Sequence, residues 1–259
     1  MKNIKIDLPK ELKGVELHTF SDWHIGDAQC DMAHIREAIS RVQNTNCAYC
    51  ILNGDLCNTA LKTSVSDIYS ETMPIMEQIN TLCELLTPIK DKILAITTGN
   101  HEGRAYKTDG VDIMRIVARQ LGVEDRYASE GLTLFLRFGE VKKYHTKGQK
   151  QAYAIYITHG TGGGRKVGSK ANRLEDLAGI VDADVFIHSH THLPLIFKQS
   201  FYRIHWAKSS TALVERLFVN ASASLNYGGY GQTAGFKPSS KSNPVVYLNG
   251  TKREMGARL

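Results

Sequence analysis

Five short polar clusters follow apolar, strand-like stretches of this chain and contain residue types that bind metal ions. They are Asp22-Trp23-His24, Gly54-Asp55, Gly99-Asn100-His101-Glu102, His159-Gly160 and His190-Thr191-His192. Oxygen and nitrogen donors without a thiolate suit manganese, iron or zinc in an open catalytic site better than a closed structural zinc site. Gathered at one sheet edge, they supply enough ligands for two divalent ions that share a carboxylate. Two metal ions about 3.5–4 Å apart form a device that many enzymes use to attack phosphate esters.

In their order and residue types, these clusters resemble the motifs of the calcineurin-like metallophosphoesterase family. That family reads Asp-x-His, Gly-Asp, Gly-Asn-His-Asp/Glu, a lone His before a small residue, and Gly-His-x-His. The resemblance extends from Ser21 to His192. One such motif occurs by chance, whereas five in the right order, each at a strand end, are specific. The run Gly162-Gly163-Gly164-Arg165 and the glycine- and tyrosine-rich C-terminal segment add a similarity to short metallophosphoesterases of phage and prophage genomes.

The resemblance implies a role for each motif residue. One metal ion would be bound by Asp22, His24, Asp55 and His192, and the other by Asp55, Asn100, His159 and His190. Asp55 would therefore bridge the two ions. His101 would act as general acid beside the leaving group, and the nucleophile would be a water or hydroxide whose pKa the cations lower. Manganese is the ion expected to support activity best. Candidate residues for binding the substrate phosphate are Arg104, Arg165 and Lys166.

Three positions depart from the family pattern. Ser189 stands where the family has glycine before its last His-x-His, and its small size is expected to preserve close backbone approach. Asn58 stands where some members have an aspartate that pairs with the catalytic histidine, and its amide is expected to orient His101 without stabilising a cation. His188 adds a third histidine, which would share a face with His190 and His192 in an unbroken strand. We interpret His188 as a hydrogen-bonded histidine beneath the site.

The glycine-rich stretch over residues 160–170 is not a P-loop, because a P-loop requires Lys directly after its last Gly, followed by Ser or Thr. Here Ser169 precedes Lys170. The stretch predicts a flexible loop that is rich in backbone amides and contains Arg165, Lys166 and no acidic residue. Such a loop beside a dinuclear site is suited to gripping phosphate. The alternative is a solvated turn with no role in binding.

The positive charge of the chain lies near its end. Residues 198–259 hold nine Lys/Arg and two Asp/Glu, a net charge of +7, whereas the whole chain is +6. Aromatic residues, among them Trp206, Tyr227, Tyr230 and Phe236, are interleaved with the basic ones. Basic groups near aromatics suit single-stranded or duplex nucleic acid, with phosphates held by charge and bases by stacking. The alternative is that the aromatics face the core and the lysines face solvent.

The motifs lie between alternating strand and helix patterns. Strands are predicted over 14–20, 47–52, 93–97, 132–138, 152–157, 185–188, 195–201, 213–219 and 245–248. Helices are predicted after an N-cap at Asp31 through residue 42, and over 67–86, 110–121 and 173–180. An α/β front half and a strand-rich back half indicate an α/β, four-layer α-β-β-α sandwich of two mixed sheets flanked by helices. We expect one domain over 1–259, with 198–259 as a basic strand-and-loop extension of the same core.

The length and composition of the chain indicate a globular protein with a hydrophobic core. A chain of 259 residues with 42% hydrophobic content can bury a substantial core. The first residues lack the apolar stretch of a signal peptide, and no run is long enough to cross a membrane. The five cysteines have no disulfide-framework spacing, so reduced thiols in a cytoplasmic protein are expected, with the pair at Cys47 and Cys50 serving as small core residues.

The predicted function is a dinuclear-metal-dependent phosphoesterase that uses a metal-activated water, with a phosphodiester of nucleic acid as the favoured substrate. An alternative is a phosphatase or phosphodiesterase for a small phosphorylated metabolite or cyclic nucleotide. A second alternative is a binding module that kept the fold and lost the chemistry. Loss of chemistry should show as missing ligands, and a coordinating residue stands at every ligand position of the motifs.

Overall fold

Two six-stranded mixed sheets form the centre of the molecule. The computed structural model describes residues 1–62, 64, 68–141 and 148–259. The first sheet has the order β1 (Lys2–Asp7), β6 (Leu132–Phe138), β7 (Gln151–Ile157), β8 (Val185–His188), β10 (Ser210–Asn220) and β9 (Leu195–His205). The second has the order β12 (Met255–Arg258), β11 (Val245–Asn249), β2 (Gly14–Phe20), β3 (Ala48–Asn53), β4 (Ile93–Thr97) and β5 (Tyr127–Ala128).

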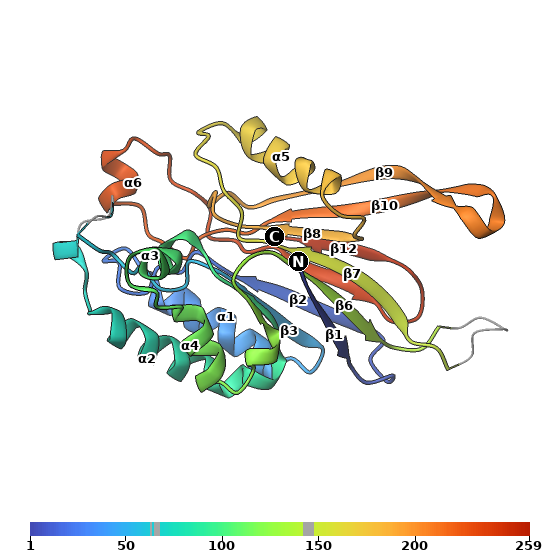
Figure 1. Cartoon of the computed structure of the whole chain (residues 1–259), viewed down its shortest axis with the longest axis horizontal. Coiled ribbons are helices and arrows are strands. Elements are labelled where there is room, and N and C mark those ends of the chain that lie inside the picture. The colour runs from blue at the N-terminus through green and yellow to red at the C-terminus, as the bar shows by residue number, and fades with distance from the viewer. Residues whose placement is uncertain (63, 65–67, 142–147) are drawn as a thin grey trace.

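Helices cover the outer faces of the two sheets, which gives the predicted four layers (Figure 1). The second sheet packs against α1 (Met32–Asn44), α2 (Ile75–Leu86) and α4 (Ile113–Gln120). The first sheet packs against α5 (Val167–Asp176). Two further helices, α3 (Asn100–Asp109) and α6 (Gly229–Thr233), lie at the end of the sheets where the strand order places the motifs. The predicted fold class is therefore confirmed.

Alternation along the strands sorts apolar side chains into separate cores. In β3, Ile51 points to the core between the sheets, whereas Cys50 and Leu52 point to the core beneath the helices. In β6, Leu134 and Leu136 are fully buried between the sheets, and Phe135 lies on the outer face and is exposed. Strands buried on both faces read as continuous apolar runs, which is why β3 and β4 lack charged residues and are mainly apolar up to their last residues, Asn53 and Thr97.

The strands that carry the motifs run parallel to their neighbours. In the second sheet β2, β3 and β4 are parallel, and in the first sheet β7, β8 and β10 are parallel. Their carboxyl ends therefore meet at one edge of each sheet. Because ligands in such sheets bind outside the carboxyl ends of the strands, this edge is where a site is expected.

The helix boundaries differ from the prediction at prolines and caps. The helix predicted over 67–86 begins at Ile75, because Pro74 favours the first turn and disfavours a helical residue before it. Upstream lies only the 3₁₀ turn Ile68–Ser70, and residue 67 is outside the described residues. The helix predicted over 110–121 begins at Ile113, where the Asp112 side chain accepts a hydrogen bond from the amide of Arg115. The N-cap predicted at Asp31 is confirmed.

Several elements were not predicted. Helix α3 begins within the Gly-Asn-His-Glu motif, and three strands (β1, β5 and β12) complete the sheet edges. Helix α5 begins at Val167 and ends at Asp176, followed by a 3₁₀ turn over Leu177–Gly179, so the expected loop over 160–170 is partly helical and the helix predicted over 173–180 is displaced. The other 3₁₀ turns are Thr87–Lys92, Glu124–Arg126 and Trp206–Lys208.

Strands β9 and β10 are longer than predicted, at eleven residues each, and pair along their full length as a hairpin. All five cysteines are free. Among the described residues, the helices are too short or too polar to cross a bilayer.

Candidate metal centre

The structure brings together all seven predicted metal ligands at the carboxyl ends of five strands. Asp22 and His24 follow β2, and Asp55 follows β3. Asn100 follows β4 as the first residue of α3, His159 follows β7, and His190 and His192 follow β8. Six of these side chains, together with His101, form three groups whose ligand atoms lie within 4.8 Å of one another, and Asn100 lies beside one of the groups. Both sheets therefore contribute to one centre.

Most of the proposed ligands sit in a strained backbone conformation. Seven non-glycine residues among those described have positive φ, and five of them are Asp22, His24, Asp55, His190 and His192. Each such residue costs on the order of 1–3 kcal/mol and persists only where the surroundings enforce it. Left-handed residues also end the strand alternation, so His188, His190 and His192 do not share one face as an unbroken strand would require. This concentration of strain marks the strand ends as a functional site.

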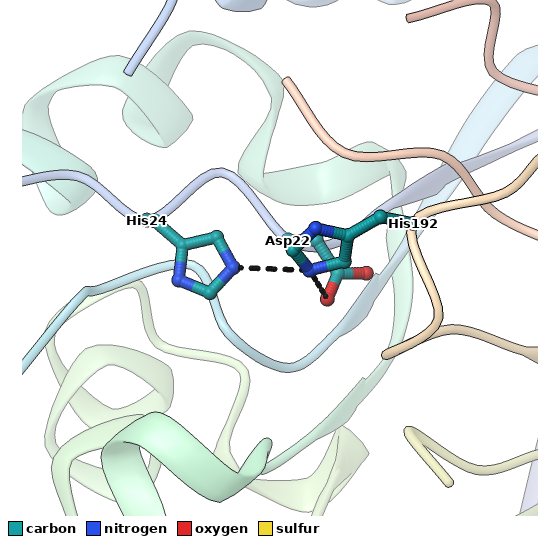
Figure 2. Close-up of side chains that lie close together, drawn as sticks. All are labelled: Asp22, His24 and His192. Carbon is teal, nitrogen blue, oxygen red and sulfur yellow. Dashed lines mark hydrogen bonds and ion pairs between the residues drawn. The ribbon is translucent and has the colours of Figure 1, made fainter. Parts of the chain in front are cut away.

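Asp22, His24 and His192 form the first group (Figure 2). Nε2 of His192 lies 3.2 Å from Oδ1 of Asp22 and 3.4 Å from Nε2 of His24. The other carboxylate oxygen of Asp22 accepts hydrogen bonds from the hydroxyl of Ser21, at 2.5 Å, and from the amide of His190. One oxygen of Asp22 is thus held by the protein, and the other faces the two imidazoles.

Asp55, His159 and His190 form the second group, with Asn100 beside them. Nδ1 of His159 donates to the carbonyl of Asn53 at 2.7 Å, which turns Nε2 toward the site. That Nε2 lies 3.1 Å from Oδ2 of Asp55 and 3.2 Å from Oδ1 of Asn100. Asp55 also belongs to a third group with His24 and His101. It is therefore the one carboxylate that two of the three groups share.

The residues present fit a pair of divalent cations. Oδ1 of Asp22 and Nδ1 of His190 are buried without a hydrogen-bond partner, which is costly unless another group binds them. Burial lowers the pKa of His24 well below its usual range and that of His190 to about 4. Both rings are therefore neutral at neutral pH, and each has a nitrogen lone pair that can bind a metal ion. Burial also opposes charge on His159, yet nearby Asp55 outweighs it and raises the pKa of His159 to about 10. The carboxylate of Asp55 therefore stabilises positive charge within its ligand group.

His101 is held at both ring nitrogens. Nδ1 donates to the backbone carbonyl of Asn58 at 2.8 Å, and Nε2 accepts from the guanidinium of Arg104 at 3.1 Å. The expected amide contact from Asn58 is wrong, because the Asn58 side chain instead hydrogen bonds to Glu71. Burial, and then the positive charge of Arg104, lower the pKa of His101, so its ring is neutral at neutral pH. The backbone carbonyl of Asn58 therefore orients His101, a role that we had predicted for the side chain of Asn58.

Asn53 joins the two sheets beneath the ligands, a role that the motifs did not reveal. Its amide nitrogen donates to the hydroxyl of Ser189 at 2.7 Å and to the carbonyl of Thr158 at 2.9 Å. Its amide oxygen accepts from the hydroxyl of Thr97 at 2.8 Å. Asn53 is fully buried. We expected Ser189 to matter only through its small size, but its hydroxyl also accepts this hydrogen bond from Asn53. The sequence contains one indication of this role, because Asn53 is a polar residue at the end of an otherwise apolar strand.

Glu102 anchors the Asp55 turn to the start of α3. Its carboxylate accepts four backbone N–H bonds, from Gly99, Asp55, Leu56 and Cys57, at 2.6–3.1 Å. Gly99 is required because a Cβ there would lie 2.1 Å from Oδ1 of Asp55. The amide of His101 donates to the same carboxylate oxygen at 2.8 Å. Glu102 therefore sets the backbone that presents Asp55, although the motif alone assigned it no role.

His188 lies beneath the site as we interpreted it. It is buried, and Nδ1 donates to the side-chain oxygen of Asn220 at 2.7 Å. The amide nitrogen of Asn220 donates to the hydroxyl of Thr191 and the carbonyl of Leu193. Asn220 thus braces the turn that carries His190 and His192, and sequence reasoning did not identify it.

The three candidate substrate-binding residues lie in different settings. Arg104 lies inside the site, against His101. Arg165 donates to the carbonyl of Ala234 at 2.9 Å and stacks over Phe236, which ties the glycine-rich loop to the segment around α6. Lys166 is exposed at the start of α5. The basic side chain that reaches the ligand turn is Lys170, which donates to the carbonyl of Thr191 at 2.6 Å.

Residues 20–194 match the family model of the calcineurin-like phosphoesterases. The match spans more than half of the chain, so the chain belongs to this family and is a metal-dependent phosphoesterase. The matched region contains every ligand described above. Comparison with curated protein sequences gives no match.

Solved structures similar to this chain include vacuolar protein sorting 29 from Cryptosporidium parvum, at 14% identity and a TM-score of 0.44, covering 95% of this chain and 97% of that chain. A metallophosphoesterase from Sphaerobacter thermophilus is 11% identical with a TM-score of 0.41, covering 93% of this chain and 90% of that chain. Vps29 from Entamoeba histolytica, solved with Zn²⁺, is 13% identical with a TM-score of 0.35, covering 91% and 86%.

Proposed function

We propose that this protein is a dinuclear-metal phosphodiesterase, with Asp22, His24, Asp55 and His192 holding one ion and Asp55, Asn100, His159 and His190 the other. The observation that supports this is a buried ligand atom without a hydrogen-bond partner in each of two groups, Oδ1 of Asp22 in one and Nδ1 of His190 in the other, with the pair His24 and Asp55 linking the two groups. When bound, two divalent ions supply an activated water nucleophile and positive charge for the phosphoryl oxygens. Manganese remains our choice of ion.

The residues of this chain have three tasks in that reaction. The turn held by Asn53, Glu102 and Gly99 fixes the bridging carboxylate, so no rearrangement is needed as charge develops. Arg104 lies beside His101 with its NH1 group buried and unpaired, a donor that a phosphoryl oxygen would satisfy. When Arg104 turns to that oxygen, the lone pair of Nε2 of His101 becomes free to take up a proton from solvent, and the ring can then donate that proton to the leaving-group oxygen.

For the substrate we propose a nucleic-acid phosphodiester. The segment over residues 221–243 is fixed to the main chain of two ligands, since the amide of Ser224 donates to the carbonyl of Asp22 and the hydroxyl of Ser239 to that of His192. Between these anchors, Tyr227 and Tyr230 expose half or more of their surface. Exposed aromatic rings beside a phosphoesterase centre suit base stacking.

A small phosphorylated metabolite is the second candidate, and one observation favours it. Of the nine basic residues in 198–259, six form ion pairs: Lys198, Arg203, Arg216, Lys241, Lys252 and Arg253. Their acidic partners come partly from upstream, as with Asp31, Asp182 and Asp184. The net charge of the segment therefore does not form an open basic face, and affinity for a nucleic acid would depend more on stacking than on charge.

Oligonucleotide binding by the metal-loaded His101→Ala protein, measured over a salt series, tests the substrate. For single strands log K falls with log salt by about 0.7 per phosphate contacted. Replacing Arg165 and Lys166 by Ala should make that slope shallower by about one to two units. Replacing Tyr227 and Tyr230 by Ala should weaken binding at every salt concentration and leave the slope unchanged.

Lys208, at the far end of the β9–β10 hairpin, provides the matched control, and Lys208→Ala should leave the slope unaltered. Hydrolysis of a small nitrophenyl diester should change little in any of these variants. Absence of oligonucleotide binding at low salt, with diester hydrolysis intact, would reject the nucleic-acid substrate and favour the small metabolite. Absence of bound metal in protein purified without chelator would reject the dinuclear centre itself.

A further inference from the structure

A glutamine is buried on the inner face of α2, which is otherwise apolar. Gln78 lies in the first turn of this helix and is fully buried, and the other buried residues of α2 are Ile79, Leu82 and Leu86. A buried side-chain amide is costly unless its donors and acceptor find hydrogen-bond partners. The partners of Gln78 therefore indicate why a polar residue stands at this position.

The peptide group between Asn58 and Thr59 connects Gln78 with His101. Its N–H, which belongs to Thr59, donates to Oε1 of Gln78 at 3.0 Å. Its C=O, which belongs to Asn58, accepts from Nδ1 of His101 at 2.8 Å. A trans peptide group is planar, so its N–H and its C=O point in opposite directions. By holding the N–H, Gln78 therefore sets the direction in which the carbonyl faces His101.

Glu71 joins the side chains of Asn58 and Gln78. One of its carboxylate oxygens accepts from the amide nitrogen of Asn58, and the other accepts from the amide nitrogen of Gln78. Nε2 of Gln78 also donates to the carbonyl of Met73 at 3.1 Å. The side chains of Asn58, Glu71 and Gln78 and the Asn58–Thr59 peptide thus form a closed ring of hydrogen bonds, which we call the amide ring.

The amide ring holds its backbone in a conformation that is rare for this residue type. Thr59 has a φ of 49°, in the left-handed region, which a β-branched residue adopts only where its surroundings enforce it. On the side of Gln78, a Cβ at Gly26 would lie 2.3 Å from Nε2. The carbonyl of Gly26 accepts from the amide of Thr72 at 2.8 Å, next to Glu71. The ring is therefore packed against backbone and has no room to shift toward Gly26.

We propose that Gln78 and Glu71 are positioning residues for the general acid, and that they act on His101 through the Asn58–Thr59 peptide. This inference rests on the proposed role of His101. A fixed carbonyl keeps the ring proton on Nδ1 and leaves Nε2, beside Arg104, as the nitrogen that serves the leaving group. Neither Gln78 nor Glu71 belongs to a ligand group.

Replacing Gln78 by Leu removes the acceptor for the Thr59 amide and keeps a side chain of similar length. Turnover on a diester with a poor leaving group should fall by about 10- to 100-fold with KM little changed, because small errors in the position of a catalytic group are costly. On a nitrophenyl diester the loss should be less than about threefold, since that leaving group needs little protonation. Gln151→Leu, at the end of β7 away from His159, changes another buried glutamine and should leave both rates unaltered.

An equal loss on both substrates in Gln78→Leu, with His101→Ala still selective for the poor leaving group, would overturn the proposal. Such a result would mean that Gln78 supports the site in general and does not act on the acid.

A reciprocal exchange tests the amide ring itself. Glu71→Gln places an NH₂ group against another NH₂ group, and Gln78→Glu places two carboxylates together, so each variant breaks the ring. In the double variant the amide at position 71 can accept from Asn58 and donate to the carboxylate at position 78, whose other oxygen accepts from Thr59. Turnover on the poor leaving group should then rise about tenfold above that of Gln78→Glu, a coupling expected of residues in one network.

Recovery in the double variant should be incomplete, because the carboxylate at position 78 cannot donate to the carbonyl of Met73. A double variant that is no faster than either single variant would overturn the proposal.

The ring proton of His101 gives a measurement that does not depend on activity. In metal-free protein with ¹⁵N-labelled histidine, Nδ1–H of His101 should give a downfield proton resonance that is absent from His101→Ala. In Gln78→Leu this proton should exchange with water faster by about tenfold or more, and the double variant should slow it again. An unchanged exchange rate in Gln78→Leu would overturn the positioning role. If His101→Ala lost activity equally on both substrates, the proposed general acid would be rejected, and this resonance would still decide whether Gln78 holds the ring of His101.

Discussion

The guanidinium of Arg104 donates to Nε2 of His101 over 3.1 Å, one turn along α3. The same ring donates from Nδ1 to the carbonyl of Asn58. His101 is therefore fixed in one tautomer, with its only lone pair already occupied. A proton can reach that nitrogen only after Arg104 has moved, so in the reaction that we propose the two residues act in sequence when a phosphate enters.

Replacing His101 by Ala should lower turnover on a diester with a poor leaving group by about 10²–10⁴, the range for general acid catalysis. With a nitrophenolate leaving group, which needs little protonation, the loss should be much smaller. Metal content by elemental analysis should stay the same, since His101 is not in the proposed ligand set. Equal losses on both substrates would show that His101 positions the substrate and does not protonate it.

Replacing Arg104 by Ala should affect the two kinetic constants differently from the His101 change. Because the guanidinium is proposed to bind the phosphoryl group, KM should rise by about tenfold, the loss of one charge-assisted hydrogen bond. Arg104→Lys should reverse part of this rise in KM, because lysine keeps the positive charge but lacks the planar pair of N–H donors of the guanidinium. Steady-state kinetics on the nitrophenyl diester make the comparison. An unchanged KM with reduced turnover would contradict phosphate binding by Arg104.

Replacing Asp55 by Asn should remove both activity and most bound metal. The proposed bridging carboxylate lies 3.1 Å from His159 and belongs to two of the ligand groups, and an amide lacks the charge to hold two cations. Metal per chain is measured by elemental analysis after equilibration with manganese. Two ions per chain and near-normal turnover would refute the bridging role. Asp27→Asn, which alters a carboxylate outside the ligand groups, is the control.

Replacing Glu102 by Gln should lower the free energy of unfolding by about 3 kcal/mol, because the new amide NH₂ would face backbone N–H donors. Glu77→Gln, at an exposed position in the first turn of α2, changes the same functional group and should cost only a few tenths of a kcal/mol. Urea unfolding of both variants gives the difference. Similar free energies for the two would show that Glu102 does not anchor the turn.

His18 should make stability depend on pH. Burial, and then Arg41, lower its pKa to about 4 from 6.5. Between these values the unfolded chain binds a proton that the folded chain does not, so stability is complete above pH 6.5 and falls as pH drops toward 4. The total is on the order of 2–3 kcal/mol. Unfolding of His18→Gln from pH 7 to 4 should show a shallower decline than wild type, whereas His205→Gln, at an exposed position, should follow wild type.

The sequence predicts the sheet layers and the meeting of the ligands well because both depend on local patterns. Apolar runs such as Ile51 and Leu52 identify buried strands, and a polar motif directly after each run must lie at the carboxyl edge. Parallel strand order then gathers Asp22 with Asp55 at the edge of one sheet and His159 with His190 at the edge of the other, and the packing of the two sheets brings these edges together. The assignment of each residue to one metal ion stays a prediction.

Long-range partners could not be predicted. Asn53 and Glu102 form hydrogen bonds with backbone groups that are distant in the sequence. The type of a polar residue does not indicate which distant group it will contact. Charge was misleading for the same reason, since net charge along the chain ignores acids brought in by folding, such as Asp182 beside Arg203. Helix α3 was missed because its glycine and charged residues give no apolar stripe.

Two of the three candidate ligand groups take residues from both sheets, since His192 joins Asp22, and His159 joins Asp55. The contributing positions are separated by more than a hundred residues of chain. A growing or refolding polypeptide can pair β2, β3, β4 and β5 early, but it cannot complete these two groups until β7 and β8 have docked on those strands. High-affinity metal uptake is then a late event of biogenesis, and a chain whose two layers have slipped apart would lose its ions before it lost its secondary structure.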